Sequence, residues 1–215
     1  MTRQPRTRPT LEEVAAAAGV GRGTASRVIN GSSKVSEKAR QAVERAIAEL
    51  GYVPNQAART LVTQRTDAVA LVIAESEERV FAEPFFAGVV RGIGTSLSDA
   101  RLQLVLLLAD TGHRSGRLDD YLTRQHVDGV LLLSLHDDDG LPERIRARGL
   151  PFVLGGRATE DQEGAYVDVD NVLGARLAVD HLVHRGRKTI ATIAGPTDMV
   201  VGRTRHDGYL AGLTA

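Results

Sequence analysis

The segment between positions 22 and 30 carries the side chains whose chemistry is clearest in this sequence. In the run RGTASRVIN, a period of 100° per residue gathers five positions on one side of a helix: Arg22, Gly23, Ser26, Arg27 and Asn30. In the major groove of DNA, arginine can pair with guanine and asparagine with adenine. No carboxylate lies on this side of the segment. The pattern therefore favours a helix that reads base edges, although taken alone it also fits an ordinary surface helix.

The first 53 residues contain the elements that must position this segment. Thr10 and Glu13 have the spacing of a capping box, which predicts a helix from position 11 that ends at Gly19. Ser36 is a good N-cap for a third helix, which is expected to end before Gly51. The side of the middle helix expected to face the other two is formed by Thr24, Ala25, Val28 and Ile29. Three short helices with a glycine turn after the first are typical of an all-α helix-turn-helix head.

Charge is unevenly distributed along the chain. The whole sequence has 27 basic and 27 acidic residues and a net charge of zero. Residues 1–65 hold 11 Lys and Arg against 5 Glu, a balance of +6, and the remainder holds 16 basic and 22 acidic residues, a balance of −6. A basic head on a more acidic body indicates binding to a polyanion such as DNA, whereas a solvated charged surface is the alternative.

Beyond residue 66, nearly continuous apolar runs alternate with helical stretches. Such runs are typical of strands buried on both faces of a parallel sheet, and the alternation predicts a doubly wound α/β body. The apolar runs are Ala68–Ala74, Leu102–Ala109, Val127–Leu135, Pro151–Leu154 and Thr189–Ala194. The helical stretches are Phe85–Asp99, Ser115–Gln125, Leu141–Arg148 and Leu173–His184. Ligands of such sheets bind outside the carboxyl ends of the strands.

A short segment, Pro54 to Leu61, joins the head to the body. It has the length of about two helical turns, and a helix that short is marginal in water on its own. A plain linker is the alternative interpretation.

Several classes of protein do not fit the composition. The chain has no Cys, so disulfides, thiolate metal sites and a cysteine nucleophile are excluded. We find no convincing nucleophile or acid–base pair at a strand end, and therefore expect neither an enzyme nor a metal or other cofactor. No apolar run reaches the roughly 18 residues that span a bilayer, and the N-terminus lacks the apolar core of a signal peptide. These features lead us to expect a cytoplasmic protein.

Distinct short motifs are spread along almost the whole chain. The head contains TLEEVA at 10–15, AGV at 18–20, TASRVING at 24–31 and LGYVPN at 50–55. The body contains PFF at 84–86, VDG at 127–129, VDN at 169–171 and GP at 195–196. In this combination the sequence resembles the lactose-repressor (LacI/GalR) family of bacterial transcription regulators.

The resemblance implies roles in DNA binding for two groups of residues. Arg22, Gly23 and Arg27 occupy base-reading positions, with Thr24 and Ser26 near phosphates and Asn30 at the end of the same helix. Gly23 leaves one reading position without a side chain, and Gly21 stands where the family usually caps the helix with Ser.

The resemblance also identifies residues 55–62, starting with Asn55, as a hinge helix that orders on DNA. Leu61 matches the wedge that this family inserts into the minor groove. Ala57 and Ala58 are small enough for two such helices to meet there. Prying a base step apart costs a few kcal/mol, which the contacts of the bent complex offset.

For the body, the resemblance implies a two-lobed, periplasmic-binding-protein-like core that binds a small-molecule effector, possibly a sugar. Phe86, Asp170 and Arg205 would line the cleft, since a carboxylate and a guanidinium can bind hydroxyls and a ring can cover a sugar face. Two alternatives stay open at this point. Phe86 can be part of the core, and Asp170 can cap the helix that follows it.

Together these features predict three regions: a DNA-binding domain at 1–53, a hinge and linker at 54–65, and an effector-binding and dimerisation core at 66–215. The core is expected to contain the first lobe and the start of the second, so it is incomplete at the C-terminus. We expect a homodimeric repressor on a near-palindromic DNA operator, cytoplasmic and nucleoid-associated. The main alternative is a truncated, effector-insensitive or inactive regulator fragment. A sugar-binding protein without DNA activity is less compatible with the basic head and the missing export signal, and a small-molecule enzyme is less compatible with the lack of a convincing nucleophile or acid–base pair at a strand end.

Overall fold

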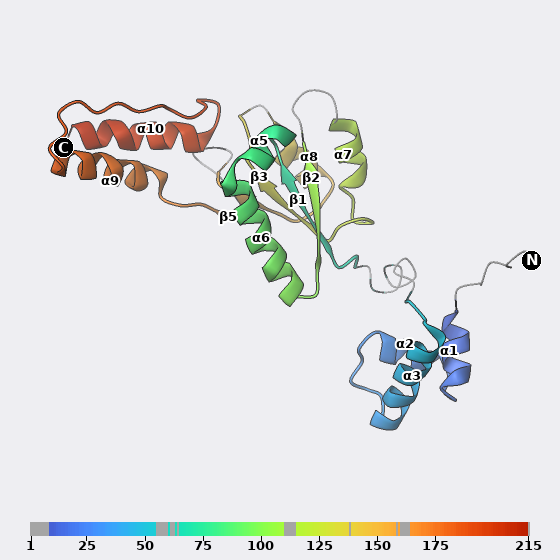
Figure 1. Cartoon of the computed structure of the whole chain (residues 1–215). Helices are drawn as coiled ribbons and strands as arrows, with labels where there is room; N and C mark the ends of the chain where they lie inside the picture. Colours follow the sequence, from blue (N-terminus) through green and yellow to red (C-terminus); the bar gives the residue numbers. More distant parts are fainter. Residues whose placement is uncertain are drawn as a thin grey trace, which may run out of the picture. The chain divides into compact units, whose positions relative to one another are not determined.

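The computed structural model describes residues 9–54, 60, 63, 65–109, 115–137, 139–157, 159 and 164–214. Contacts between Cα atoms divide the chain into two compact units, Met1–Gln64 and Arg65–Ala215. The first unit is helical and the second is built on a parallel sheet (Figure 1). The predicted fold class, a helical head with a doubly wound α/β body, is confirmed.

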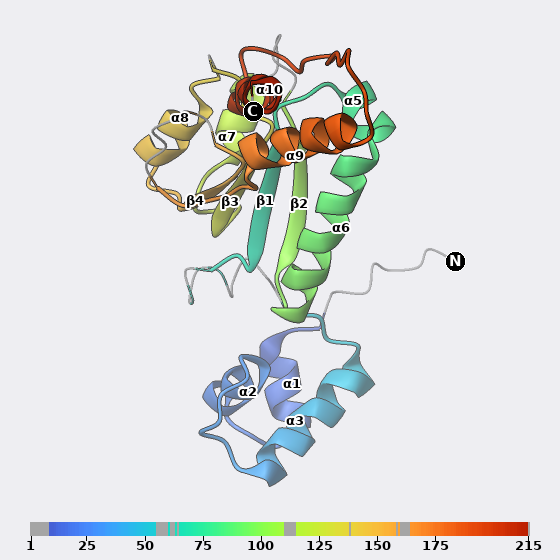
Figure 2. The ribbon, with the colours of Figure 1, turned by 90° about the vertical axis from the view of Figure 1, so that its left-hand side faces the viewer.

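The first unit consists of α1 (Leu11–Ala17), α2 (Arg22–Ile29) and α3 (Glu37–Leu50), drawn in blue in Figure 2. The capping box at the start of α1 is present, because the Glu13 backbone N–H donates to Thr10 Oγ1 and the Thr10 N–H donates to Glu13 Oε2. Ser36 caps α3 by accepting from the Ala39 N–H. Gly51 ends α3 with a φ of 63°, a left-handed conformation that glycine adopts without steric cost. The helix ends expected from the sequence are therefore confirmed.

A small apolar core holds the three helices together. Its buried residues come from all of them, two from each helix: Val14, Ala15, Ala25, Val28, Val43 and Ala46. Because two of these residues belong to α2, the packing fixes the rotation of α2 about its own axis, and thereby decides which of its side chains face the solvent.

The second unit contains five parallel strands in the order β2-β1-β3-β4-β5. Their bounds are β1 (Ala68–Ile73), β2 (Gln103–Leu108), β3 (Gly129–Leu133), β4 (Phe152–Gly155) and β5 (Tyr166–Val167). The helices that follow the strands are α5 (Glu77–Ala82), α6 (Pro84–Asp99), α7 (Ser115–Tyr121) and α8 (Leu141–Ala147). No helix of the described residues is long and apolar enough to cross a membrane.

Successive side chains of β1 point to opposite faces of the sheet, and each face has its own core. Ala70 and Val72 belong to the cluster that also contains Ile145 of α8. Leu71 and Ile73 belong to the cluster that contains Phe86 of α6. Helices therefore cover both faces, which is why the strands are continuously apolar rather than alternating.

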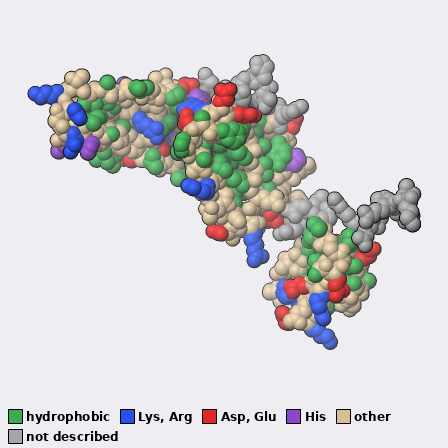
Figure 3. All heavy atoms as spheres, viewed as in Figure 1, with side chains coloured by type: hydrophobic (Ala, Val, Ile, Leu, Met, Phe, Trp, Pro, Cys, Tyr) green, Lys and Arg blue, Asp and Glu red, His purple; other side chains and the backbone are tan. Residues whose placement is uncertain are grey.

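After β5 the chain forms two long helices, α9 (Asn171–His184) and α10 (Val200–Leu213), which pack against each other. Three glycines of α10 are buried, Gly202, Gly208 and Gly212, and they allow the close approach of α9 and the preceding loop. The outer sides of this pair carry exposed leucines, among them Leu177 and Leu210. Figure 3 shows the green hydrophobic side chains spread over this part of the surface.

One expectation about the strands was wrong, and one short strand was not predicted. The run Thr189–Ala194 is not a strand, and its Ile193 is fully exposed. A strand needs a neighbouring backbone to pair with, and among the described residues this run has none beside it; instead, the Tyr209 hydroxyl donates to the Ile190 carbonyl. The sequence also gave no sign of β5, which is only two residues long and forms through its pairing with β4.

Candidate functional site

The exposed face of α2 is the one that the sequence predicted. Ala25 and Val28 are buried, so the opposite side of the helix faces outward. Arg22, Arg27 and Asn30 are exposed there, together with Gly23, whose added Cβ would meet no atom within 4 Å. Ser26 and Thr24 are half-buried at the edges of this face. The structure thus brings the predicted base-reading positions onto one accessible surface.

The contacts on this face differ between its two arginines. The Arg22 Nε atom lies 3.0 Å from Glu12 Oε1 of α1, an ion pair whose two side chains are mostly exposed. Within the described part of the chain, Arg27 makes no side-chain hydrogen bond or ion pair. Asn30 Nδ2 donates to Ser26 Oγ at 3.3 Å. One arginine of this face is therefore held by a carboxylate of α1, and the other has no such partner among the described residues.

The start of α2 lacks a side-chain cap. Gly21 occupies the N-cap position with a φ of −70° and makes no side-chain hydrogen bond to the helix. The backbone N–H groups of a first helical turn have no partner within the helix, and phosphate oxygens are suitable acceptors for them. The glycine noted in the sequence therefore leaves this end of α2 open to an anion.

The predicted hinge residues Asn55, Ala57, Ala58 and Leu61 lie outside the described residues. Their roles stay predictions.

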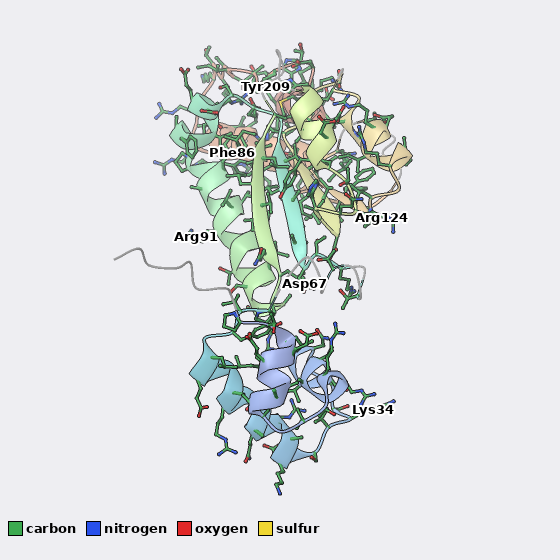
Figure 4. The ribbon with its side chains drawn as sticks, turned by 90° about the vertical axis from the view of Figure 1, so that its right-hand side faces the viewer. Lys34, Asp67, Phe86, Arg91, Arg124 and Tyr209 are labelled. Atoms are coloured by element: carbon green, nitrogen blue, oxygen red, sulfur yellow. The ribbon has the colours of Figure 1, made fainter. Side chains whose placement is uncertain are left out.

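Phe86, predicted to line the effector cleft, lies in the core. It is 2% exposed and packs with Leu71, Ile73 and Leu133 near the start of α6, and Figure 4 labels its position. The exposed ring at this position is that of Phe85, whose centroid lies 5.3 Å from that of Phe86 in an edge-to-face arrangement. Of the two interpretations left open by the sequence, the structure supports the core residue.

Asp170 and Arg205 both lie at the start of α9, where Arg205 is held by a residue that sequence reasoning did not single out as a site. Asp170 caps α9, because its Oδ1 accepts from the Leu173 N–H at 2.8 Å. The Arg205 Nε donates to Asn171 Oδ1 at 2.9 Å. Asn171 is buried, and its Nδ2 donates to Asp168 Oδ1 and to the Val169 carbonyl. The buried amide thus holds the exposed guanidinium of Arg205 at the start of α9, the helix that the exposed Asp170 caps, and a guanidinium and a carboxylate are both groups that can bind hydroxyls.

A second polar group lies just beyond the carboxyl ends of β1 and β3, and sequence reasoning missed it. Glu75 is buried there and accepts from Arg79 Nη1 at 3.0 and 3.1 Å and from Ser134 Oγ at 2.7 Å. Ser134 holds a φ of 62°, which a residue other than glycine rarely adopts. The available signal was the position of Glu75 and Ser134 directly after apolar runs, at the edge where such sheets bind ligands.

His136 links this group to the segment that precedes α10. Its Nδ1 lies 2.8 Å from Asp198 Oδ2, and its Nε2 lies 3.7 Å from Glu75 Oε1. Burial disfavours the charged imidazolium, but the hydrogen bond to Asp198 and the charges of Asp198, Glu75 and Asp139 outweigh it and raise the pKa of His136. The same hydrogen bond from His136 lowers the pKa of Asp198.

A second bridge reinforces this link. The Arg203 Nη1 donates to Asp137 Oδ2 at 2.7 Å and to the Thr197 carbonyl at 2.8 Å. The Asp137 backbone N–H donates to the Asp198 carbonyl. The loop after β3 is therefore joined to the start of α10 by several polar contacts.

The chain matches two family models that together cover most of its length. Residues 10–55 match the model described as bacterial regulatory proteins, lacI family. Residues 66–215 match the model described as periplasmic binding proteins and sugar binding domain of LacI family.

Related proteins of known function are transcription regulators. The HTH-type transcriptional regulator CelR of Thermobifida fusca is 57% identical over 98% of this chain. The ribose operon repressor of Escherichia coli (strain K12) is 34% identical over 95% of it. The chain spans 62% and 61% of the length of these two relatives.

Solved structures agree with these matches. A complex of the transcriptional regulator CelR with cellobiose is 54% identical, with a TM-score of 0.67, and the match covers 96% of this chain and 62% of that one. The Lac repressor dimer bound to operator and the anti-inducer ONPF is 28% identical, with a TM-score of 0.80, covering 97% of this chain and 62% of that one.

Proposed function

The chain belongs to the lacI family of bacterial regulatory proteins, and on this premise we propose that it is a sequence-specific DNA-binding transcriptional regulator. The observation that carries the proposal is the outward face of α2, where Arg22, Arg27 and Asn30 are exposed while Ala25 and Val28 anchor the opposite side. We infer that it acts as a repressor by occupying an operator. It would do so where the DNA is, in the cytoplasm and associated with the nucleoid.

Binding strength and base reading would come from different groups. Lys and Arg side chains of the head neutralise phosphates, which gives affinity for any duplex and a steep dependence on salt. Arg22 and Arg27 would supply selectivity, and each good bidentate pair with a base contributes about 1–3 kcal/mol of discrimination. Asn30 would add a contact at the end of the helix, with Thr24 and Ser26 near phosphates.

We infer a homodimer on a near-palindromic operator, because two copies related by a twofold axis place their recognition helices in successive major grooves. Leu61 would be the minor-groove wedge, with Ala57 and Ala58 at the contact between the two hinge helices and Asn55 at their start. A marginal helix suits this role, since a small bias decides whether it folds.

We propose that a sugar is the effector. The binding groups would be Asp170, which caps α9, and Arg205, whose Nε donates to the buried Asn171 at the start of the same helix. Cellobiose is the first candidate, because a CelR complex with cellobiose is 54% identical to this chain. Such a ligand regulates only through its difference in affinity between two states of the protein. Calorimetry with cellobiose and with maltose as the comparison tests this assignment, and Arg205→Ala should abolish the binding that the wild type shows.

The test of DNA recognition is a selection of bound sequences from random duplex DNA with the 215-residue chain. We expect enrichment of a near-palindrome. The Arg27→Ala variant should lose the preference at one base position of each half-site while it still binds duplex DNA. A wild-type chain that enriches no sequence would contradict the proposed function.

A further inference from the structure

The ion pair between Glu12 and Arg22 connects α1 to the DNA-reading face of α2. Its Nε–Oε1 distance is 3.0 Å, and the side chains are 60% and 73% exposed, respectively. Exposed ion pairs of this kind add little to the stability of a fold. The neighbouring Glu13 forms the capping box of α1, so Glu12 is not needed for that task. Stability therefore does not account for the pair.

The geometry of the pair matters for base reading. A guanidinium has five N–H donors in a planar fork. Glu12 contacts the Nε, the donor closest to the backbone, and this leaves the terminal Nη1 and Nη2 groups of Arg22 available. Guanine presents two acceptors, O6 and N7, in the major groove, and a planar fork with two open donors matches them. An arginine held in this way also loses less conformational freedom when it binds.

The rest of α2 gives Arg22 no other support. Gly21 provides no side-chain cap, and Gly23 has no side chain to pack beside the arginine. Arg27 lies one and a half turns further along and has no comparable carboxylate among the described residues. The chain thus contains one supported and one unsupported arginine on the same face.

We propose that Glu12 is a specificity-determining residue for DNA binding, which orients Arg22 toward guanine and keeps it from pairing with phosphate instead. The inference rests on the proposed function. Without Glu12, Arg22 is free to swing to the nearest phosphate, a contact that every sequence offers. The carboxylate also repels the phosphates of any duplex, and only where Arg22 finds a guanine does that contact offset the repulsion. Glu12 therefore lowers affinity for unrelated DNA and raises discrimination.

The experiment compares wild type with Glu12→Gln, each as the full chain, by fluorescence anisotropy at one salt concentration. Three duplexes are used: the selected operator, the operator with the base pair read by Arg22 replaced, and a scrambled sequence. The base pair is identified as the one whose preference Arg22→Ala loses. We expect Glu12→Gln to bind the scrambled duplex about two- to five-fold more tightly, and its discrimination at that base pair to fall by a similar factor. Glu49→Gln, which removes a charge from an exposed residue of α3, should leave the discrimination unchanged.

Two backgrounds separate an effect through Arg22 from a general change in charge. In Arg22→Ala, adding Glu12→Gln should not reduce discrimination any further. In Arg27→Ala, the matched background, Glu12→Gln should have its full effect at the base pair read by Arg22. Circular dichroism melting of each variant checks that the head remains folded.

The outcomes distinguish a failure of the role of Glu12 from a failure of the proposed function. If the wild type selects a sequence but Glu12→Gln discriminates as well as wild type, the role of Glu12 is wrong and the proposed function stands. The role of Glu12 is also wrong if Glu12→Gln lowers the discrimination by the same factor in the Arg22→Ala background as in wild type. If the wild type selects no sequence at all, the proposed function itself fails, and the inference about Glu12 fails with it.

Discussion

The packing of α9 against α10 makes a sharp prediction at Gly208. A Cβ added at this buried position would overlap the carbonyl oxygen of Val172 and lie 2.9 Å from the Cβ of Ala175. A backbone oxygen cannot rotate away as a flexible side chain can, so Gly208→Ala must push the two helices apart. Gly174, in α9, offers the matched control, because its Cβ would meet no atom within 4 Å.

The expected changes in the stability of the helix pair follow from two opposing effects. Overpacking costs about 1–3 kcal/mol, and a clash with the backbone of α9 belongs at the upper end of that range. Replacing glycine by alanine inside a helix returns about 1 kcal/mol. Gly208→Ala should therefore destabilise the helix pair by about 2 kcal/mol, which is roughly a 30-fold change in the opening equilibrium. Gly174→Ala should stabilise it by about 1 kcal/mol, since only the helix preference changes.

Hydrogen exchange of the full chain, followed by mass spectrometry, measures both changes locally. Peptides covering 171–184 and 200–213 should exchange faster in Gly208→Ala and more slowly in Gly174→Ala, while peptides of the first unit stay unchanged. Equal effects of the two variants, or slower exchange in Gly208→Ala, would refute the packing argument.

Three further predictions concern pH, salt and the hinge. The raised pKa of His136 contributes stability that is fully present below the ordinary pKa of 6.5 and is lost as pH rises through the folded-state pKa. The lowered pKa of Asp198 contributes stability that is present above the ordinary pKa of 3.8 and is lost as pH falls through the folded-state pKa. The protection of peptides that cover 197–203, taken relative to the intrinsic rate of amide exchange at each pH, should accordingly be greatest between these two values and respond less to pH in His136→Gln. Lys34→Ala, at an exposed position of the head, should weaken binding to all duplexes alike and reduce the slope of log affinity against log salt by about 0.9. Leu61→Ala should lower affinity for the operator more than for scrambled DNA, and an equal loss for both would exclude the wedge role.

The elements that the sequence predicted well are those determined by nearby residues. The start of α1 depends on Thr10 and Glu13, which are three positions apart, and the end of α3 depends on the single residue Gly51. The orientation of α2 follows from a helical period within eight residues. In each case, the interactions that decide the structure lie within one or two turns of the chain.

The features that the sequence did not predict depend on partners far along the chain. Ser134 meets Glu75 across 59 positions, and His136 meets Asp198 across 62. The run at 189–194 has a strand-like composition, but composition does not provide a neighbouring strand. The position of Phe86 also depends on distant partners. From the sequence alone, an aromatic residue after a buried strand can line a cleft or belong to the core, and only the packing of α6 decides between the two.

The two glycines at the start of α2 explain why its proposed base-reading face depends on the other helices. Gly21 gives no cap, and Gly23 gives no side chain, so the first turn of α2 has no local anchor. Its position is set by Ala25 and Val28 in the core, and the first side chain of the reading face is held by Glu12 of α1. A change in α1 should therefore alter base preference without touching α2, whereas in a helix with its own cap the same change would act mainly on stability.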